Sequence, residues 1–183
     1  MGTYVVLLCA VNVGGTGKLP MADLRRLLGD LGYRNVETYI QSGNAVFDAP
    51  GKAAAVRKAV AQALEQHMGA PVGVILRTHE ELSRVIAANP FAAEAAADGA
   101  RVHVGFMTGT AAHGAQAGLE AIVAKYPARR DRFHLAGDTL YLHLPDGAAE
   151  TKFTTQALNR VLGVASTGRN WNTVCKLHAM SLR

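Results

Sequence analysis

The sequence has little of what stabilises small secreted proteins or anchors membrane proteins. It contains only 2 cysteines, Cys9 and Cys175, and their separation matches no metal-binding spacing. No apolar run approaches the roughly 20 residues that a membrane-spanning helix needs. The N-terminus enters an apolar strand-like run at once, without a charged leader or a cleavage site. These absences predict a soluble cytoplasmic protein with reduced thiols.

Aromatic and charged residues are also scarce, at 6% and 18% of the chain. The hydrophobic fraction of 49% is that of a globular protein, and a chain of 183 residues can bury a core without disulfides or metals. The net charge of +5 favours anionic partners mildly. The basic residues are scattered, with a near-cluster only at residues 129–132, whereas dedicated nucleic-acid binders usually group theirs.

Hydrophobic periodicity predicts one order of elements, βαββαβ, twice along the chain. In the first half, strands are expected at residues 3–11, 36–41, 44–48 and 72–76, and helices at residues 21–31 and 52–68. In the second half, strands are expected at residues 101–107, 132–136, 139–144 and 164–166, and helices at residues 114–125 and 151–162. A short helix at residues 80–88, with a capping box between Thr78 and Glu81, precedes a polar linker. A helix from about residue 170 to residue 180 closes the chain.

This repeated order predicts an α+β fold of two tandem ferredoxin-like units with antiparallel sheets, plus a linking helix and a C-terminal helix. We expect the first unit at residues 1–78, the connecting helix and linker at residues 79–100, and the second unit with its C-terminal helix at residues 101–183. The shared order suggests a duplication, although the residues themselves are not visibly repeated.

A glycine-rich loop at residues 12–18 is the first candidate site. In the expected topology, this loop and the hairpin between the second and third strands lie at the same end of the sheet. Main-chain N–H groups of a glycine loop, a following helix N-terminus and a lysine suit an anion. The candidate ligand-binding residues here are Asn12, Gly14, Gly15, Lys18, Gln41, Ser42 and Asn44.

The same loop matches neither the P-loop pattern nor the dinucleotide-binding pattern, because Asn12, Leu19 and Pro20 stand at positions where these patterns require other residues. The alternative interpretation is a structural turn, in which glycines supply positive φ and Asn12 and Asn44 bond to the backbone.

The second candidate is the run Arg169, Asn170, Trp171 and Asn172, with Lys176 one turn further on. An arginine beside an indole could stack on a base or clamp a carboxylate. The alternative is that Asn170 caps the last helix and Trp171 anchors it in the core.

The third candidate is one face of the second sheet. Strand alternation predicts that the following residues face the helices: Val102, Val104, Phe106, Phe133, Leu135, Leu140, Leu142 and Leu144. The opposite face would carry Arg101, His103, Arg132, His134, Tyr141 and His143. Such a face resembles the sheet on which RNA-recognition motifs stack bases, but their aromatic signature is missing. Three histidines could bind zinc or copper, although no carboxylate completes the set. The remaining interpretation is a solvated or dimer-facing sheet.

Three motifs resemble those of the domain-of-unknown-function 1697 family, an uncharacterised bacterial protein family: Asn-Val-Gly-Gly at residues 12–15, Tyr-Ile-Gln-Ser-Gly-Asn at residues 39–44 and Arg-Asn-Trp-Asn-Thr at residues 169–173. The resemblance covers nearly the whole chain and implies a pair of ferredoxin-like halves with no agreed activity. Cys9 and Ala10 stand where the family usually has Arg-Gly. Any ligand contact that relatives make through that arginine is therefore missing here.

The leading functional hypothesis is binding of a small molecule or anion, phosphate-like or nucleotide-like, at the loop end of the first sheet, which residues 169–172 could complete. The rivals are nucleic-acid binding through the second sheet and an interaction module whose open sheets pair into a dimer. No nucleophile–base pair or paired carboxylates stand out, so catalytic residues are not predicted and an enzymatic role stays open. No cofactor, resident metal or membrane partner is expected, and the oligomeric state is open.

Overall fold

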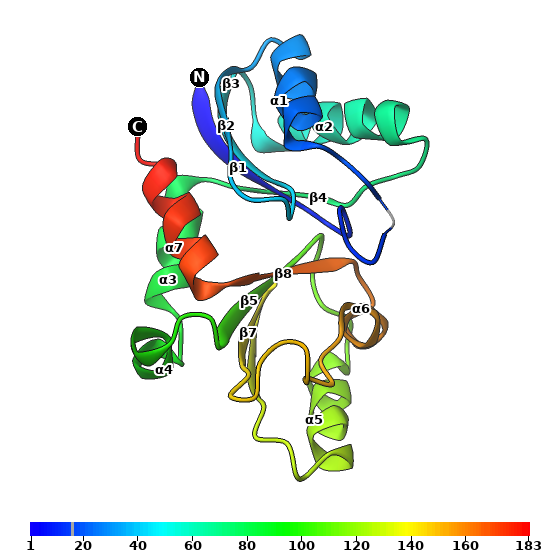
Figure 1. The fold of residues 1–183 in the computed structure, drawn as a ribbon, viewed down its shortest axis with the longest axis vertical. Coiled ribbons are helices and arrows are strands. Elements are labelled where there is room, and N and C mark those ends of the chain that lie inside the picture. Colours follow the sequence, from blue (N-terminus) through cyan, green and yellow to red (C-terminus); the bar gives the residue numbers. More distant parts are fainter. Residues whose placement is uncertain (16) are drawn as a thin grey trace. The chain divides into compact units, whose positions relative to one another are not determined.

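The first apolar run forms the central strand of a four-stranded antiparallel sheet in the computed structural model, which describes residues 1–15 and 17–183 (Figure 1). The strand order is β2-β3-β1-β4. The strands are β1 (Gly2–Leu8), β2 (Arg34–Thr38), β3 (Asn44–Ala49) and β4 (Val74–Arg77). Two helices connect them, α1 (Met21–Asp30) and α2 (Ala53–Met68). This is the predicted ferredoxin-like arrangement.

Side chains from alternate positions of β1 form the core beneath α1 and α2. Tyr4, Val6 and Leu8 pack with Phe47 of β3 and with buried residues of both helices. Phe47 also stacks on Tyr33, with ring centroids 5.1 Å apart. Burying one large aliphatic or aromatic side chain contributes about 1.5–3 kcal/mol, so this layer stabilises the unit.

The second sheet repeats the order of the first, as β6-β7-β5-β8. Its strands are β5 (Val102–Met107), β6 (Arg132–Ala136), β7 (Thr139–His143) and β8 (Ser166–Asn170). The helices α5 (Ala115–Lys125) and α6 (Thr155–Leu162) cover one face, where Leu119, Leu140, Leu142 and Leu162 meet. The remaining helices are α3 (His79–Ala87), α4 (Ala92–Ala97) and α7 (Trp171–Met180).

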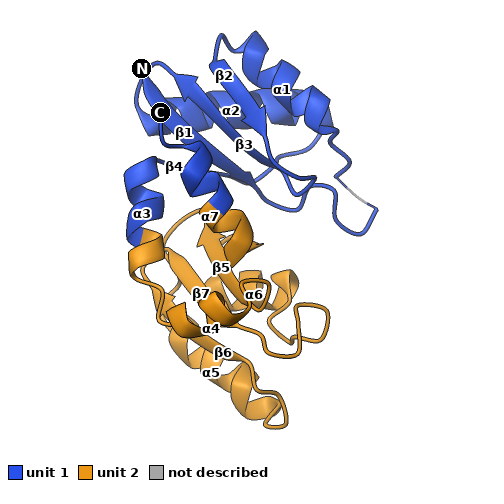
Figure 2. Ribbon diagram, turned by 60° about the vertical axis from the view of Figure 1, so that its left-hand side comes forward, with its two compact units in different colours: residues 1–84, 176–183 blue, residues 85–175 orange. Residues whose placement is uncertain are grey.

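The chain divides into two compact units whose bounds differ from the expected ones (Figure 2). Unit 1 comprises residues 1–84 and 176–183, and unit 2 comprises residues 85–175. The end of the chain therefore returns to the first unit. Arg183 donates to the backbone oxygen of Asn35 at 2.8 Å and to Glu37 Oε1 at 2.5 Å, within unit 1.

Several expected element bounds need correction. The predicted linker contains helix α4. Helix α6 begins at Thr155, and the Thr154 hydroxyl caps it by accepting from the Ala157 N–H at 3.2 Å. The last strand, β8, runs from Ser166 to Asn170, four residues beyond the expected end at residue 166. The predicted capping box is confirmed, since the Glu81 N–H donates to Thr78 Oγ1 and the Thr78 N–H donates to Glu81 Oε2.

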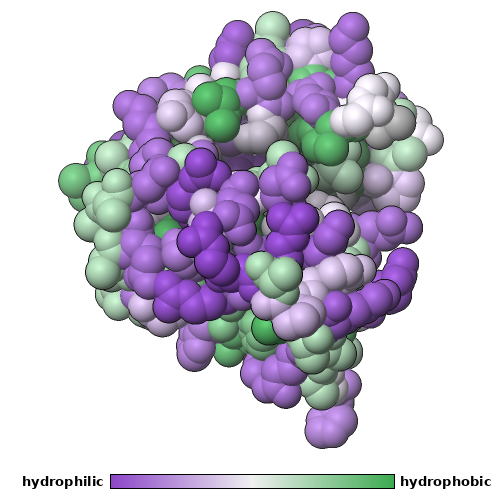
Figure 3. Space-filling view, turned by 60° about the horizontal axis from the view of Figure 1, so that its bottom comes forward, coloured by the Kyte–Doolittle hydropathy of each residue, from purple (hydrophilic) through white to green (hydrophobic). Residues whose placement is uncertain are grey.

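None of the described helices is long and apolar enough to span a bilayer. Hydrophilic side chains predominate on the face of the molecule seen in Figure 3, with hydrophobic ones interspersed among them.

Candidate functional site

The amide side chain of Asn12 joins the glycine loop to the hairpin before β3. Its Nδ2 donates to the backbone oxygens of Leu19 at 2.8 Å and Gln41 at 2.7 Å, and its Oδ1 accepts from the Leu19 N–H at 2.8 Å. The Asn12 N–H donates to the Gly17 oxygen at 2.9 Å. The predicted proximity of loop and hairpin is confirmed. We call residues 9–19 and 39–44 the loop rim; Thr16, within the predicted loop, lies outside the described residues.

The hairpin side of the loop rim is held by Asn44, which is fully buried. Its Nδ2 donates to the Tyr39 oxygen at 3.0 Å and to Ser42 Oγ at 2.9 Å. Asn12 and Asn44 thus use both amide hydrogens to hold main chain and hairpin in place. These bonds match the alternative interpretation of the two asparagines as parts of turns, so any ligand would bind to other groups of the loop rim.

The backbone of the loop rim is strained. Ala10, Asn12 and Ile40 have φ of 53°, 53° and 50°, in the left-handed region that side chains with a Cβ rarely adopt. Asparagine tolerates this region, but alanine and the β-branched isoleucine do not favour it. Gly43 needs its φ of 81° and its missing side chain, because a Cβ would lie 2.4 Å from Val11 Cγ2 and 2.9 Å from Leu8 Cβ.

The exposed groups of the loop rim are a cation, main-chain amides and two apolar side chains. Lys18 is exposed and makes no hydrogen bond or ion pair with the described part of the chain. Gly14 and Gly15 have no atom within 4 Å of the place where a Cβ would stand. Val13 and Ile40 are 63% and 50% exposed. The loop rim has no carboxylate side chain, so its local charge is positive.

The predicted run at residues 169–172 lies in unit 2 and divides between β8 and α7. Asn170 caps α7, since its Oδ1 accepts from the Thr173 N–H at 2.9 Å. The capping role is therefore confirmed for Asn170. Arg169 is 5% exposed and donates to Thr167 Oγ1 at 2.6 Å and to the Gly168 oxygen at 2.9 Å. Trp171 is half-buried and Asn172 is exposed.

Two of the three sequence motifs thus lie together on the loop rim, and the third spans the junction of β8 and α7. A family model described as "Protein of unknown function (DUF1697)" matches residues 1–141. The chain belongs to this family. No curated protein matches the chain.

One solved structure shares the fold of this chain. The conserved bacterial protein SP0830 from Streptococcus pneumoniae is similar with a TM-score of 0.70 at 22% identity, over 100% of this chain and 99% of that one. An unknown protein from Galdieria sulphuraria matches over 92% of this chain and 98% of that one at 14% identity, with a TM-score of only 0.27. At these identities the likeness to SP0830 concerns the fold alone.

The face assigned to β5 in the second sheet is wrong. His103 pairs with Leu142 of β7, and Leu142 lies in the core beneath α5 and α6, so His103 points toward the helices. Val104 pairs with Tyr141 on the opposite face. The side chains of Val102, Val104 and Phe106 therefore leave the helix-covered face. The inward assignments in β6 and β7 are confirmed for Phe133, Leu135, Leu140 and Leu142, and for Leu144, which follows β7.

Hydrophobicity could not select the correct phase of β5, because the strand is apolar at nearly every position.

The end of α3 and helix α4 cover part of the second face within unit 2. Tyr141 is 2% exposed and its hydroxyl donates to the Val85 oxygen at 2.7 Å. Burial, reinforced by Asp138, raises the pKa of Tyr141 to about 12. The face that was predicted to be open is therefore covered at Tyr141.

The charged residues that the sequence assigned to this second face are also engaged. Arg132 forms an ion pair with Glu94 of α4, lies 5.0 Å from the Phe91 ring centroid and is 3.0 Å from His143 Nδ1. Arg101 precedes β5 and pairs with Asp98 at 3.5 Å. His134 remains exposed.

The three histidines of this sheet do not share one face, since His103 points away from His134 and His143. Burial lowers the pKa of His103, and its buried Nδ1 has no hydrogen-bond partner within the described residues. Among residues 1–15 and 17–183, no three His, Cys, Asp or Glu side chains are grouped as a metal site.

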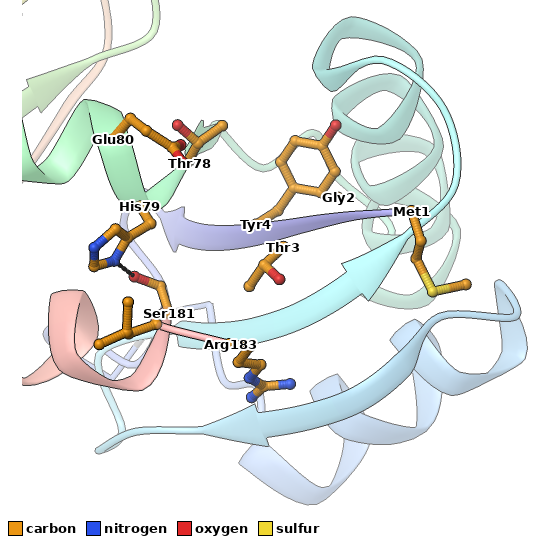
Figure 4. A pocket seen from close by; sticks show the side chains of 10 residues that line it. Met1, Gly2, Thr3, Tyr4, Thr78, His79, Glu80, Ser181 and Arg183 are labelled. Carbon is orange, nitrogen blue, oxygen red and sulfur yellow. Dashed lines mark hydrogen bonds between the residues drawn. The ribbon is translucent and has the colours of Figure 1, made fainter.

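A pocket of about 360 Å³ in unit 1 was not predicted from the sequence (Figure 4). Its lining includes Thr3 and Tyr4 of β1, His79 at the start of α3, and Ser181 and Arg183. Most of its polar groups are already bonded. Thr3 donates to Asp48 at 2.7 Å, Tyr4 donates to the Gly51 oxygen at 2.9 Å, and His79 Nδ1 lies 3.0 Å from Ser181 Oγ. Few groups remain to select a ligand, so the loop rim is the stronger candidate.

Proposed function

We propose that the protein binds a small anionic molecule, phosphate-like or nucleotide-like, at the loop rim. The observation that carries the proposal is an exposed Lys18, without a partner among the described residues, in a glycine loop that Asn12 ties to the hairpin. Anions bind where main-chain N–H groups and a cation converge without an opposing carboxylate. Gly14 and Gly15 are exposed and have no atom within 4 Å of the place of a Cβ, so an anion can approach their main chain.

The surroundings of the loop rim support the same class of ligand. Helix α1 begins three residues after Lys18, and the N-terminus of a helix carries partial positive charge. Asp23, the acidic residue in its first turn, lies 3.6 Å from His67 Nε2 and 3.9 Å from Arg26. Gln41 could add a hydrogen bond, and the exposed side chains of Val13 and Ile40 offer apolar contact for the rest of the ligand.

The test is thermal unfolding in the presence of inorganic phosphate, adenine and guanine nucleotides, and small dicarboxylates. A ligand present at 100 times its Kd stabilises the folded protein by about 2.7 kcal/mol, which is a shift of several degrees. We expect the shift in the wild type and in Lys58→Ala, which removes an exposed lysine on α2, and a much smaller shift in Lys18→Ala. No shift with any of these compounds, or an equal shift in all three proteins, would contradict the proposal.

No observation favours the two other functions that the sequence left open. The nucleic-acid alternative placed Tyr141 on an open sheet face as its lone aromatic residue, but its ring is buried and its hydroxyl donates to the Val85 oxygen. Arg101 and Arg132 are each paired with a carboxylate. An interaction module would need an open sheet face, and Tyr141 lies on a covered part of that face.

A further inference from the structure

Two histidines in unit 1 stack where the end of the chain meets helix α3. The rings of His79, in α3, and His178, in α7, lie with centroids 4.2 Å apart and planes 18° from parallel. Ser83 Oγ lies 2.8 Å from His178 Nε2, and Ser181 Oγ lies 3.0 Å from His79 Nδ1. The sequence gives no sign of this cluster, because its members are separated by about 100 residues.

The hydrogen-bond directions determine where each ring carries its hydrogen. His79 Nδ1 lies 3.2 Å from the His178 carbonyl oxygen, which can only accept, and 3.0 Å from Ser181 Oγ. Ser181 donates its own hydrogen to that same carbonyl at 2.7 Å. His79 Nδ1 must therefore be the donor, and the neutral ring carries its hydrogen there.

The second ring is determined in the same way. Ser83 donates to the His79 backbone oxygen at 3.0 Å, so its Oγ accepts from His178 Nε2 at 2.8 Å. With both rings neutral, each of these ring N–H groups and serine hydroxyls donates to an acceptor. Any further proton must go to His79 Nε2 or His178 Nδ1, and protonating both rings would place two positive charges face to face.

The neighbouring charges are of both signs, and Glu80, the carboxylate beside His79, is exposed to solvent, which screens its charge. On α3 they are Glu80, Glu81 and Arg84, on α7 Lys176, and beyond α7 Arg183. Glu81 is engaged in the capping box with Thr78, and Arg183 is bonded to Glu37 and lies 3.7 Å from Asp48. Burial, followed by the charge of His79, lowers the pKa of His178. Protonation therefore favours the state in which the rings separate. The stacked contact between α3 and α7 weakens as the pH falls below the ordinary histidine range.

We propose that the stacked pair His79–His178 is a pH-sensitive latch. It holds residues 176–183 on α3 when the stack is uncharged and releases them when the stack becomes positively charged. Release also withdraws Arg183 from Asn35, Glu37 and Asp48, which uncovers the open edge of β2, while Asp48 keeps its hydrogen bonds from Thr3 and Asn35. The latch is a conformational device within unit 1 and does not depend on ligand binding at the loop rim.

Amide hydrogen exchange of the full chain tests the latch. After correction for the intrinsic exchange rate, we expect protection of the amides of residues 177–183 to fall about tenfold from about pH 7.5 to about pH 5.5. Protection in α2, which belongs to the same unit, should not fall. In His178→Phe, which retains an aromatic ring but cannot be charged, this local fall should disappear. His113→Gln, at an exposed position of unit 2, should behave like the wild type.

If His178→Phe does not fold, His79→Phe replaces it in the test, because it removes the other ring that can be charged. Three results would overturn the latch: protection of residues 177–183 that does not depend on pH, a loss shared equally with α2, or a local loss that persists in the phenylalanine variant.

Discussion

The two units have the same strand order, but the ends of their sheets are built differently. In unit 1, a glycine loop and a long hairpin meet at Asn12, and three non-glycine residues there have positive φ. In unit 2, Gly137 and Asp138 form a tight turn between β6 and β7, and Gly137 supplies the positive φ of 60°. Every non-glycine residue with positive φ in the described chain belongs to unit 1: Ala10, Asn12, Asn35 and Ile40.

This difference shows that the topology does not require the strain. Unit 2 closes the same arrangement of strands with relaxed backbone. A residue other than glycine in the left-handed region costs about 1–2 kcal/mol, and such costs concentrate where backbone is held for binding or catalysis. The strain at Ala10 and Ile40 is therefore a second reason to examine the loop rim.

The largest effect is expected from Gly43→Ala. The added Cβ would overlap Val11 and Leu8 at a φ of 81°, so we expect destabilisation of about 3 kcal/mol. Gly137→Ala in unit 2 has positive φ but no atom within 4 Å of the new Cβ, so it should cost about 1 kcal/mol. Urea unfolding of both variants measures the difference. Equal losses would mean that the loop rim is no more tightly packed than the turn in unit 2.

Asn12→Ala should have the next largest effect. It removes three side-chain hydrogen bonds and places alanine at positive φ, so we expect a loss of about 2 kcal/mol. The matched variant in unit 2 is Asn159→Ala, whose Oδ1 accepts from Ser166 N at 2.9 Å and from Ser166 Oγ at 2.8 Å.

The two asparagine variants are distinguished by ligand response rather than by stability. Asn12→Ala should lose the thermal shift produced by an anionic ligand, and Asn159→Ala should retain it. A retained shift in Asn12→Ala would show that the junction of loop and hairpin is not needed for binding.

The smallest expected effect is a gain in stability. Ala10→Gly relieves strain that exceeds the entropy cost of glycine, so we expect stabilisation of roughly 0.5–1 kcal/mol. Ala136→Gly, at the exposed end of β6, should instead destabilise by about 0.5–1 kcal/mol. Thermal and urea unfolding would show the opposite signs. Destabilisation by Ala10→Gly would remove strain as a distinguishing feature of the loop rim.

Much of the fold could be predicted because periodicity and turn residues act locally. The apolar stripe of α1, the Ser42-Gly43 turn and the capping box at Thr78 each predicted an element that the structure contains. The proximity of Asn12 to Gln41 followed from topology, since loop and hairpin lie at one end of a ferredoxin-like sheet. The family resemblance was carried by motifs that sit at this same end.

Other features could not be predicted for physical reasons. Helix α4 is mostly alanine and has no apolar stripe to distinguish it from a linker. The strain at Ala10 and Ile40 is invisible in sequence, because neither residue type favours positive φ. The phase of β5 was misassigned because both of its faces are buried, and alternation is informative only when one face is exposed.

The sequence by itself determined the order of the elements, their approximate bounds and the family, because these depend on hydrophobic periodicity and turn residues within short stretches of chain. The tertiary structure alone decided that residues 176–183 return to the first unit, that His79 and His178 stack, and that Asn12 closes the loop rim. Such long-range contacts depend on which surfaces remain available once the sheets have formed, and that information is spread over the whole chain.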